Sequence, residues 1–213
     1  MNFLPGQYLE WTLSQQHSDS RGNRRYFTIA SSPKENEISI GVRFYQPPSK
    51  YKQDLLAMQT GDRLLAGQLA GDFVLPKNKK KKLAFIAGGI GITPFRSMLK
   101  DLIDRNESRP IVMFFSNRHA DEVIYQDVLE EAYKKLGIKT VYAVTGDKNL
   151  EPEERLYTRR LDPEIVAHEL PDFKQRTFMI SGSQGLVDGT RQMLLGMGIP
   201  GRQIKTDFFP GLA

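Results

Sequence analysis

The sequence has no cysteine and only three histidines, and both shortages limit the chemistry that the chain can carry. Without cysteine there is no disulfide, no thiolate nucleophile and no cysteine-ligated zinc or iron–sulfur centre. The histidines, His17, His119 and His168, stand far apart and lack metal-ligand spacing, so we predict no metal site. Any redox chemistry in this chain therefore requires a bound organic cofactor.

Long apolar runs are also missing. No stretch approaches the roughly 20 residues that cross a bilayer, and no charged-then-apolar signal peptide opens the chain. We therefore expect no membrane segment and a cytoplasmic location. If the chain is part of a longer, membrane-associated protein, a missing membrane domain is allowed, and the expected location is the cytoplasmic face of that membrane.

Basic residues exceed acidic ones by 30 to 25, which gives a formal net charge of +5. An anionic ligand, an acidic protein partner or a nucleic acid would each suit this modest excess. The run Lys79–Lys82 contains no aromatic residue to stack on bases, so we interpret it as a solvated turn and expect no nucleic-acid partner. A phosphate-bearing cofactor is the simpler explanation for the excess positive charge.

The first third of the sequence has the pattern of short strands broken by turns of glycine, proline, asparagine and serine. The expected strands are residues 7–13, 25–30, 37–45 and 63–66, with a short helix over residues 49–58. This pattern predicts an N-terminal antiparallel β-barrel.

After the lysine run, apolar strands alternate with segments of helical periodicity. The expected strands are residues 83–87, 111–115, 140–144 and 177–180, and the expected helices are residues 95–102, 121–136 and 186–197. Such alternation predicts βαβ units and a Rossmann-like parallel sheet flanked by helices. We therefore expect an all-β domain over residues 1–78 and an α/β domain over residues 79–213.

The glycine-rich segment Ala87–Pro94 lies where a buried strand passes into a helix. Its glycines let the backbone approach a pyrophosphate, the amides at the helix start donate to it, and proline suits a first helical turn. The candidate dinucleotide contacts are Gly88, Gly89, Gly91, Thr93 and Pro94. Because Pro94 replaces the last glycine of the common G-x-G-x-x-G pattern, a structural turn remains the alternative on this segment alone.

The order of these segments, ending in Asp-Phe-Phe at residues 207–209, resembles the ferredoxin–NADP reductase family of flavoproteins. The resemblance also rests on Pro5–Tyr8, Arg25–Ser31 and Gly71–Pro76, and it covers nearly the whole sequence. It implies an NAD(P)H-dependent reductase that contains FAD, with the flavin held by the barrel. It also implies that this barrel lacks the first strand usual in the family.

The segment from Arg25 has the residue types of a flavin platform. A guanidinium pairs with a pyrophosphate, an aromatic face lies on an isoalloxazine ring, and a hydroxyl reaches its N5 atom. By resemblance these roles fall to Arg25, Phe27 and Thr28, with Tyr26 among the flavin contacts. A plain amphipathic strand with its aromatic residues in the core is the alternative.

The short helix opens with the segment Ser49–Lys52, which resembles a second contact to the flavin pyrophosphate, and the cofactor-binding residues expected in it are Ser49, Lys50 and Tyr51. A simple N-cap by Ser49 is the alternative, and the two are compatible.

The second half supplies candidates for the nicotinamide end. Ser181 and Gly182 follow the strand at residues 177–180, where the family has a cysteine beside the nicotinamide; a plain serine-glycine turn is the alternative. By resemblance, Asp207 relays protons or orients the ring, and Phe209 covers the flavin. The catalytic residues expected on this resemblance are Thr28, Ser181, Asp207 and Phe209.

The sequence leaves the choice between NADH and NADPH open. The 2′-phosphate of NADP requires basic side chains, whereas free ribose hydroxyls favour an acidic one. Asp147, after the strand at residues 140–144, favours NADH. Arg118, Arg155 and Tyr157 favour NADPH, so the expected dinucleotide is NAD(P)H.

Together these features lead to the hypothesis of hydride transfer from NAD(P)H to bound FAD, followed by electron transfer to an acceptor. The sequence does not identify that acceptor, which we expect to be a protein, a separate domain or a small molecule. One alternative keeps the fold but not the chemistry: a nicotinamide-binding or regulatory module whose shortened barrel binds flavin poorly.

Overall fold

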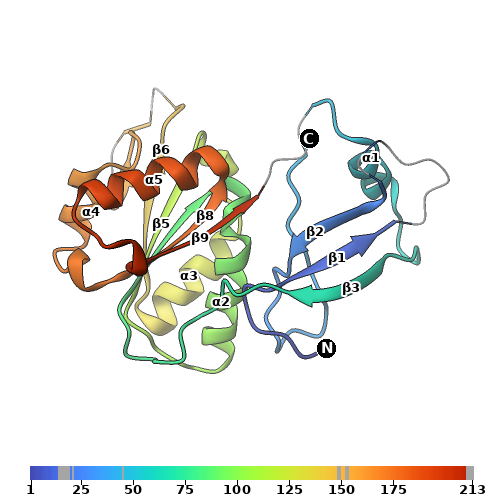
Figure 1. Ribbon diagram of the computed structural model, residues 1–213, viewed down its shortest axis with the longest axis horizontal. Helices are drawn as coiled ribbons and strands as arrows, with labels where there is room; N and C mark the ends of the chain where they lie inside the picture. The colour runs from blue at the N-terminus through green and yellow to red at the C-terminus, as the bar shows by residue number, and fades with distance from the viewer. Residues whose placement is uncertain (14–19, 21, 45, 148–149, 152–153, 210–213) are drawn as a thin grey trace.

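The computed structural model describes the whole chain except residues 14–19, 21, 45, 148–149, 152–153 and 210–213. Among the described residues, the named strands form two sheets: a three-stranded sheet ordered β2-β1-β3 and a six-stranded sheet ordered β7-β6-β5-β4-β8-β9. We call them, together with the helices beside them, the antiparallel lobe, which includes α1, and the parallel lobe, which includes α2 to α5. They stand side by side, and β9 runs from the parallel lobe toward the antiparallel one (Figure 1).

The antiparallel lobe is built on alternation along its central strand. Its elements are β1 (Tyr8–Thr12), β2 (Arg24–Thr28), α1 (Lys50–Ala57) and β3 (Leu65–Ala70), and β1 pairs antiparallel with both neighbours. Every second residue of a strand faces the same side, so Leu9 and Trp11 both point inward. They pack with Phe3 and Ile29 in a small core of their own.

Two strand predictions in this lobe are corrected by the structure. The strand expected at residues 37–45 reduces, over its described part, to a single bridge between Ile29 and Ile40. The segment is instead pressed against the parallel lobe: a Cβ on Gly41 would lie 2.8 Å from the hydroxyl oxygens of both Thr93 and Tyr125. The strand expected at residues 63–66 begins at Leu65 and continues to Ala70. The antiparallel class of the sheet is confirmed.

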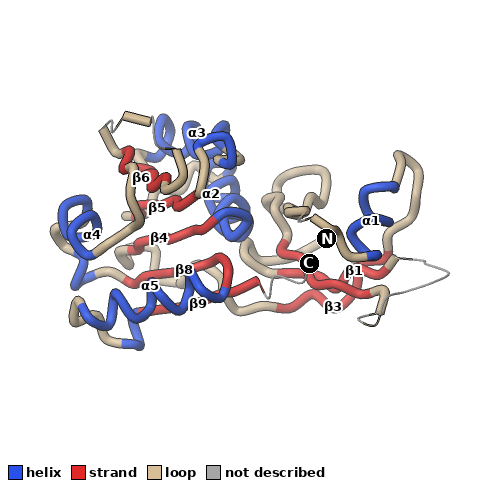
Figure 2. Tube along the Cα trace, turned by 90° about the horizontal axis from the view of Figure 1, so that it is seen from above, coloured by secondary structure: helices blue, strands red, loops and turns tan. Residues whose placement is uncertain are grey.

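The parallel lobe is a sheet covered on both faces. Its strands are β4 (Leu83–Gly88), β5 (Ile111–Asn117), β6 (Lys139–Val144), β7 (Leu156–Tyr157), β8 (Thr177–Ser183) and β9 (Ile204–Phe209). Its helices are α2 (Thr93–Asp104), α3 (Gln126–Leu136), α4 (Pro163–Glu169) and α5 (Gln184–Gly196), with short 3-10 turns η1 (Gly89–Ile92), η2 (Ala120–Glu122), η3 (Phe173–Gln175) and η4 (Gly201–Gln203). Figure 2 shows α2 and α3 on one side of the sheet and α4 and α5 on the other.

Alternate residues of the central strand serve the two faces. Phe85 and Ala87 pack under α2 and α3, whereas Ala84 and Ile86 pack toward α4 and α5. A strand buried on both faces is nearly continuously apolar, which is why the segment from Leu83 was recognisable as a central parallel strand. The Rossmann-like class predicted from the sequence is confirmed.

The helix expected over residues 121–136 is interrupted. Ala120–Glu122 forms only a 3-10 turn, and α3 starts at Gln126 after Tyr125, which adopts a left-handed backbone with φ of 59°. Gly137, also left-handed, ends α3. The sequence patterns missed α4, β7 and β9, of which β7 has only two residues. No helix among the described residues is long and apolar enough to cross a membrane.

Helix α2 joins the two lobes. Its Arg96 guanidinium donates to the Ala30 carbonyl at 3.0 Å and to the Glu35 carboxylate at 2.9 Å. One residue on, the Ser97 hydroxyl donates to the Ser31 carbonyl at 2.6 Å. Since Ala30, Ser31 and Glu35 belong to the antiparallel lobe, the helix that starts at the glycine-rich turn is fixed to both lobes.

Candidate functional site

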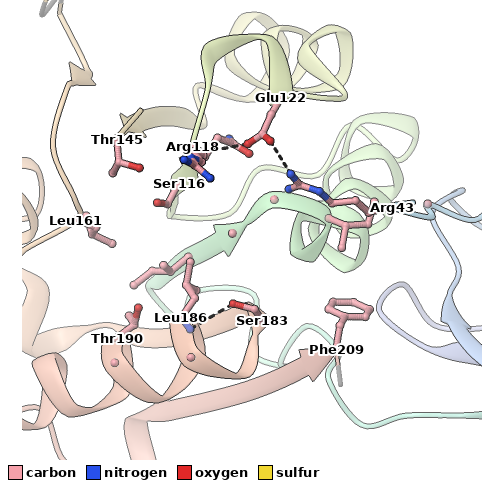
Figure 3. A pocket seen from close by; sticks show the side chains of 18 of the residues that line it. Arg43, Ser116, Arg118, Glu122, Thr145, Leu161, Ser183, Leu186, Thr190 and Phe209 are labelled. Atoms are coloured by element: carbon pink, nitrogen blue, oxygen red, sulfur yellow. Dashed lines mark hydrogen bonds and ion pairs between the residues drawn. The ribbon is translucent and has the colours of Figure 1, made fainter. Parts of the chain in front are cut away.

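A cavity of about 1010 Å³ opens between the lobes. The parallel lobe contributes the carboxyl ends of β4 and β5 and the first turns of α5, and the antiparallel lobe contributes β2 and residues 41–43. Figure 3 shows α5 on one side and the segment after β5 on the other, with Phe209 and Arg43 at one end. Ligands of open parallel sheets bind at the carboxyl ends of the strands, so the cavity has the expected place for a dinucleotide.

The glycine-rich turn forms the floor of this cavity between β4 and α2. Gly88, Gly89 and Ile90 line it. A Cβ on Gly88 would lie 2.2 Å from Leu186 Cδ1, and Gly89 has a left-handed φ of 51°. Only glycine fits both positions without strain, and the missing side chains leave room for a phosphate group of a ligand to approach the backbone.

The other three residues predicted from this turn have a supporting role. Gly91, Thr93 and Pro94 are buried and lie behind the cavity wall. A Cβ on Gly91 would lie 2.3 Å from the carbonyl oxygen of Ser181, so the turn is pressed against the end of β8. Thr93 Oγ1 donates to the Ile90 carbonyl at 2.7 Å, which secures the turn at the start of α2.

Strand β2 supplies the facing wall. Arg25, Tyr26 and Phe27 line the cavity, whereas Thr28 is buried beside them without lining it. Arg25 is only 8% exposed, and its guanidinium lies over the ring of Tyr51 at 4.9 Å. The predicted Arg25–Phe27 platform therefore faces the cavity, with a cation and an aromatic ring side by side.

The start of α1 reaches the cavity through the last residue of the segment expected to contact the flavin pyrophosphate. Ser49 caps the helix, with its hydroxyl accepting from the Lys52 amide, and Lys50 is exposed and paired with Asp54. Tyr51 is fully buried and donates to the Trp11 carbonyl at 3.0 Å; burial raises its pKa to about 12. Among these residues Lys52 lines the cavity, and it is only 9% exposed.

The ends of β8 and β9 carry the residues predicted for the nicotinamide. Ser181 is fully buried and is the register partner of Asp207. The two parallel strands end at Ser183 and Phe209, and both of these residues line the cavity. Burial raises the pKa of Asp207 to about 6, the charge of Asp72 adds to the rise, and the Ser181 hydroxyl opposes it. Gly182 lies between Ser181 and Ser183, and a Cβ on Gly182 would lie 3.2 Å from Leu186 Cδ2.

The residues expected to determine the preference for NADH or NADPH do not all line the cavity. Arg118 lines the cavity. The Asp147 carboxylate is held by His119 Nδ1 at 2.6 Å and by the Ala120 amide at 2.7 Å, and these hydrogen bonds lower its pKa. Asp147 therefore secures the loop after β5 and is not a cavity-lining residue.

Arg155 and Tyr157 also lie outside the cavity lining. The Arg155 guanidinium lies 4.8 Å from the ring of Tyr133, and Tyr157 donates to Glu169 at 2.6 Å. Arg160, which no sequence motif marked, lines the cavity with Arg118. It follows β7, so its proximity to the carboxyl ends of β5 and β6 was visible only once the sheet order was known.

One ion pair closes the cavity between the lobes. Arg43 Nη2 lies 2.5 Å from Glu122 Oε1, and the other carboxylate oxygen of Glu122 accepts from the Arg118 amide at 3.1 Å (Figure 3). Burial favours a higher pKa for Glu122, but the Arg43 charge and the hydrogen bonds from the Arg118 and His119 amides outweigh it and lower the pKa. A Cβ on Gly89 would lie 3.1 Å from Arg43 Nη1, so this guanidinium also stands over the glycine-rich turn.

No group of three or more histidine or acidic side chains suited to a metal ion occurs in the part of the chain that the structure describes, which does not include His17. His119 is held by Asp147, and His168 lies 3.1 Å from the Tyr157 hydroxyl.

A parallel sheet with a glycine-rich turn, facing a wall of cations and an aromatic ring, has the fold of the FAD- and NAD(P)-binding reductases of the ferredoxin reductase type. Residues 85–192 match the sequence profile of the oxidoreductase NAD-binding domain. The chain belongs to that family.

Similar proteins agree with this class. A flavohemoprotein of Bacillus subtilis (strain 168) is 25% identical over 209 residues, which cover 97% of this chain and 51% of the flavohemoprotein. The chain spans about half the length of the curated relatives it matches.

Two solved structures share the fold. The flavohem-like FAD/NAD-binding domain of nitric oxide dioxygenase from Vibrio cholerae O1 biovar El Tor has a TM-score of 0.83 at 18% identity, covering 98% of this chain and 86% of that one. The ferredoxin–NADP+ reductase of Plasmodium falciparum has a TM-score of 0.77 at 19% identity, covering 98% and 84% respectively.

Proposed function

We propose that this chain binds NAD(P)H and FAD in the cavity between its lobes and carries out hydride transfer from the first to the second. The observation that carries the proposal is that one cavity is lined by the glycine-rich turn on one side and by Arg25 and Phe27 on the other. Residues 1–78 would then form the flavin domain and residues 79–213 the dinucleotide domain. The cytoplasmic location expected from the sequence remains part of the proposal.

The residues present fit both cofactors. The turn at Gly88 and Gly89 has no side chains, so a pyrophosphate can lie close to its backbone. Arg25 and Lys52, both cations and both nearly buried, fit the anionic part of a flavin dinucleotide, and Phe27 offers a ring face beside them. FAD, when bound, supplies a hydride acceptor that can release electrons one or two at a time.

The chain's own residues orient the reactants and hold a proton. Gly91 presses the turn against Ser181, which fixes the floor of the cavity relative to the end of β8. Phe209, at the end of β9, lines one end of the cavity, where its ring would cover the flavin. Asp207 exchanges a proton near neutral pH because its pKa is about 6.

The electron acceptor is part of the proposal in general terms only. We propose a partner protein, a further domain of a longer chain or a small molecule. The flavohemoprotein among the relatives is about twice as long as the segment matched here, which is consistent with a reductase portion that serves a second domain.

Anaerobic titration with NADH and NADPH in parallel, following the flavin absorbance band, tests the function. We expect a yellow protein whose band bleaches on addition of one or both dinucleotides. A colourless protein that takes up no added FAD would refute the reductase and favour the nicotinamide-binding or regulatory module.

A further inference from the structure

Arg118 reaches the cavity from the loop that follows β5, and the loop that follows β6 lies against it. Because β5 and β6 are adjacent parallel strands, residues 117–120 and residues 145–147 leave the same edge of the sheet. Arg118 and Thr145, one from each loop, both line the cavity (Figure 3). The position of the Arg118 side chain therefore depends on how the two loops are joined.

The backbones of the two loops are joined directly. The Thr145 amide donates to the Asn117 carbonyl at 3.2 Å, and the Gly146 amide donates to the Arg118 carbonyl at 2.6 Å. A Cβ on Gly146 would lie 2.7 Å from the Arg118 carbonyl oxygen and 3.0 Å from Arg118 Cγ. Glycine at this position thus lets the second loop contact both the backbone and the side-chain stem of Arg118.

The Asp147 side chain joins the loops on the other side of Arg118. One of its carboxylate oxygens lies 2.6 Å from His119 Nδ1, and the other accepts from the Ala120 amide at 2.7 Å. The hydrogen bond with His119, and after it the one from Ala120, lowers the pKa of Asp147, so the ionised carboxylate is the form that holds the loop. The residues just before and just after Arg118 are therefore both fixed by the loop after β6.

This arrangement does not suit the ribose contact that the sequence suggested for Asp147. A carboxylate that binds ribose hydroxyls has to face the dinucleotide. Asp147 instead lies outside the cavity lining and directs both oxygens at the loop after β5. Its effect on a ligand would pass through the side chain that this loop carries into the cavity, which is Arg118.

We propose that Asp147 is a positioning residue that orients Arg118 toward the 2′-phosphate of NADPH. The assignment rests on the proposed function, because it takes a nicotinamide dinucleotide as the occupant of the cavity. Arg118 is the phosphate ligand, and Asp147 keeps the backbone that carries it from shifting. A charge-assisted hydrogen bond to phosphate depends on distance and direction, so the support of its anchor determines its strength.

Rapid anaerobic flavin reduction by NADPH and by NADH tests the proposal, because its concentration dependence separates dinucleotide affinity from the limiting rate. The variants are Asp147→Ala, Arg118→Ala and the double variant. We expect Asp147→Ala to weaken apparent NADPH affinity about three- to tenfold, with the limiting rate and the NADH affinity within about twofold of the parent. In the Arg118→Ala background the same change should have no further effect, because the residue through which Asp147 acts is gone.

Asp147→Asn separates position from charge. Its amide oxygen can still accept one of the two hydrogen bonds, so we expect a smaller loss of NADPH affinity than in Asp147→Ala. It also keeps the size of the side chain, and it replaces the alanine variant if that variant does not fold. Circular dichroism and thermal melting establish that each variant is folded before its kinetics are measured.

Asp121→Ala is the matched control. Asp121 is an exposed acidic residue on the turn η2 that follows Arg118, and it lies outside the cavity lining. Its removal changes the net charge as much as Asp147→Ala does but leaves the contacts of Asp147 in place. Affinity for both dinucleotides should stay within about twofold of the parent.

Several results would overturn the assignment. An equal loss of NADPH affinity with and without Arg118 would show that Asp147 does not act through that residue. A loss confined to NADH would make Asp147 a ribose ligand, and tighter NADPH binding in both Asp147 variants would mean that its charge only repels phosphate. A parent that uses only NADH removes the 2′-phosphate contact but leaves the proposed function intact, whereas a flavin that neither dinucleotide reduces refutes the proposed function itself.

Discussion

Asp207 on β9 is the register partner of Ser181 on β8, and its partly buried carboxyl group has a pKa of about 6. Burial is the main cause, and the charge of Asp72 adds to it. The hydroxyl of Ser181, which is fully buried, lowers this pKa. This pairing places a carboxyl group with a pKa of about 6 near the ends of β8 and β9, beside the cavity.

The first prediction concerns pH. Because the folded-state pKa of Asp207 lies above its unfolded value of 3.8, the folded state holds more protons between about pH 4 and 6. The free energy of unfolding therefore falls as pH rises through this window, by at most about 3 kcal/mol. Asp207→Asn should flatten that decrease and be more stable than the parent at pH 7. Thermal melts from pH 4 to 8 measure it, and an unchanged slope in the variant would contradict the raised pKa.

Hydride transfer offers a second readout of the same group. If Asp207 holds the proton proposed for it, the pH profile of anaerobic flavin reduction has an inflection near 6 that Asp207→Asn removes.

The second prediction concerns the glycine-rich turn. A side chain on Gly91 would meet the backbone of Ser181 at 2.3 Å, and backbone cannot move aside cheaply. Gly91→Val should therefore abolish nicotinamide dinucleotide binding, and the protein should keep its flavin because the antiparallel lobe is untouched. Equilibrium titration with NAD(P)H, alongside the flavin absorbance, measures both.

Gly185→Ala is the control for this change. Gly185 also lines the cavity, but a Cβ there meets nothing within 4 Å, so dinucleotide affinity should be kept. Normal NAD(P)H binding by Gly91→Val would show that the pyrophosphate lies elsewhere.

The third prediction concerns the choice of dinucleotide. Arg118 and Arg160 line the cavity, whereas the carboxylate of Asp147 is held by His119 and the Ala120 amide. A free 2′-phosphate would meet positive charge here, so we expect a preference for NADPH. Arg118→Ala and Arg160→Ala should each lower kcat/KM for NADPH about tenfold, with a smaller effect on NADH.

Arg159→Ala is the matched control, because Arg159 is already paired with Asp162 at 3.0 Å and Glu164 at 2.8 Å. A parent enzyme that uses only NADH, or equal losses with both dinucleotides, would refute the phosphate role of the two arginines.

The fourth prediction concerns the ion pair between the lobes. Arg43 and Glu122 are each only partly exposed and lie 2.5 Å apart, so their interaction should exceed that of an exposed surface pair. A double-mutant cycle with Arg43→Met and Glu122→Gln should give a coupling energy of about 0.5–3 kcal/mol in chemical denaturation. Additive single effects would mean that the pair contributes nothing to holding the lobes together.

The sequence predicted the parts of the fold that repeat a simple pattern. Continuous apolar runs such as Leu83–Ala87 marked the buried parallel strands, and the glycine-rich turn was placed correctly between β4 and α2. The interruption at Tyr125 was not predictable, because a left-handed tyrosine depends on tertiary contacts that override local helical periodicity. The failed strand at residues 37–45 has the same origin, since Gly41 is packed against Thr93 and Tyr125 of the other lobe.

The candidate site was only partly visible in the sequence. Motif positions such as Arg25, Phe27 and Gly88 do line the cavity. Lys52, the last residue of the predicted segment Ser49–Lys52, lines it too. Arg160 also lines it, but it does so through a sheet order that one sequence does not display. For the remaining motif residues, including Ser181 and Asp207, the structure gives positions, and their roles stay predictions.

The contacts of α2 also determine how the chain can be recombined. Arg96 and Ser97 bind Ala30, Ser31 and Glu35, while the same helix forms the core of the parallel lobe. A chimera joined near residue 78 with a relative's antiparallel lobe would bring a foreign surface to these side chains. Successful exchange of modules would therefore require the face of α2 that carries Arg96 and Ser97 to come from the same parent as the antiparallel lobe, although α2 lies on the other side of the domain boundary in the sequence.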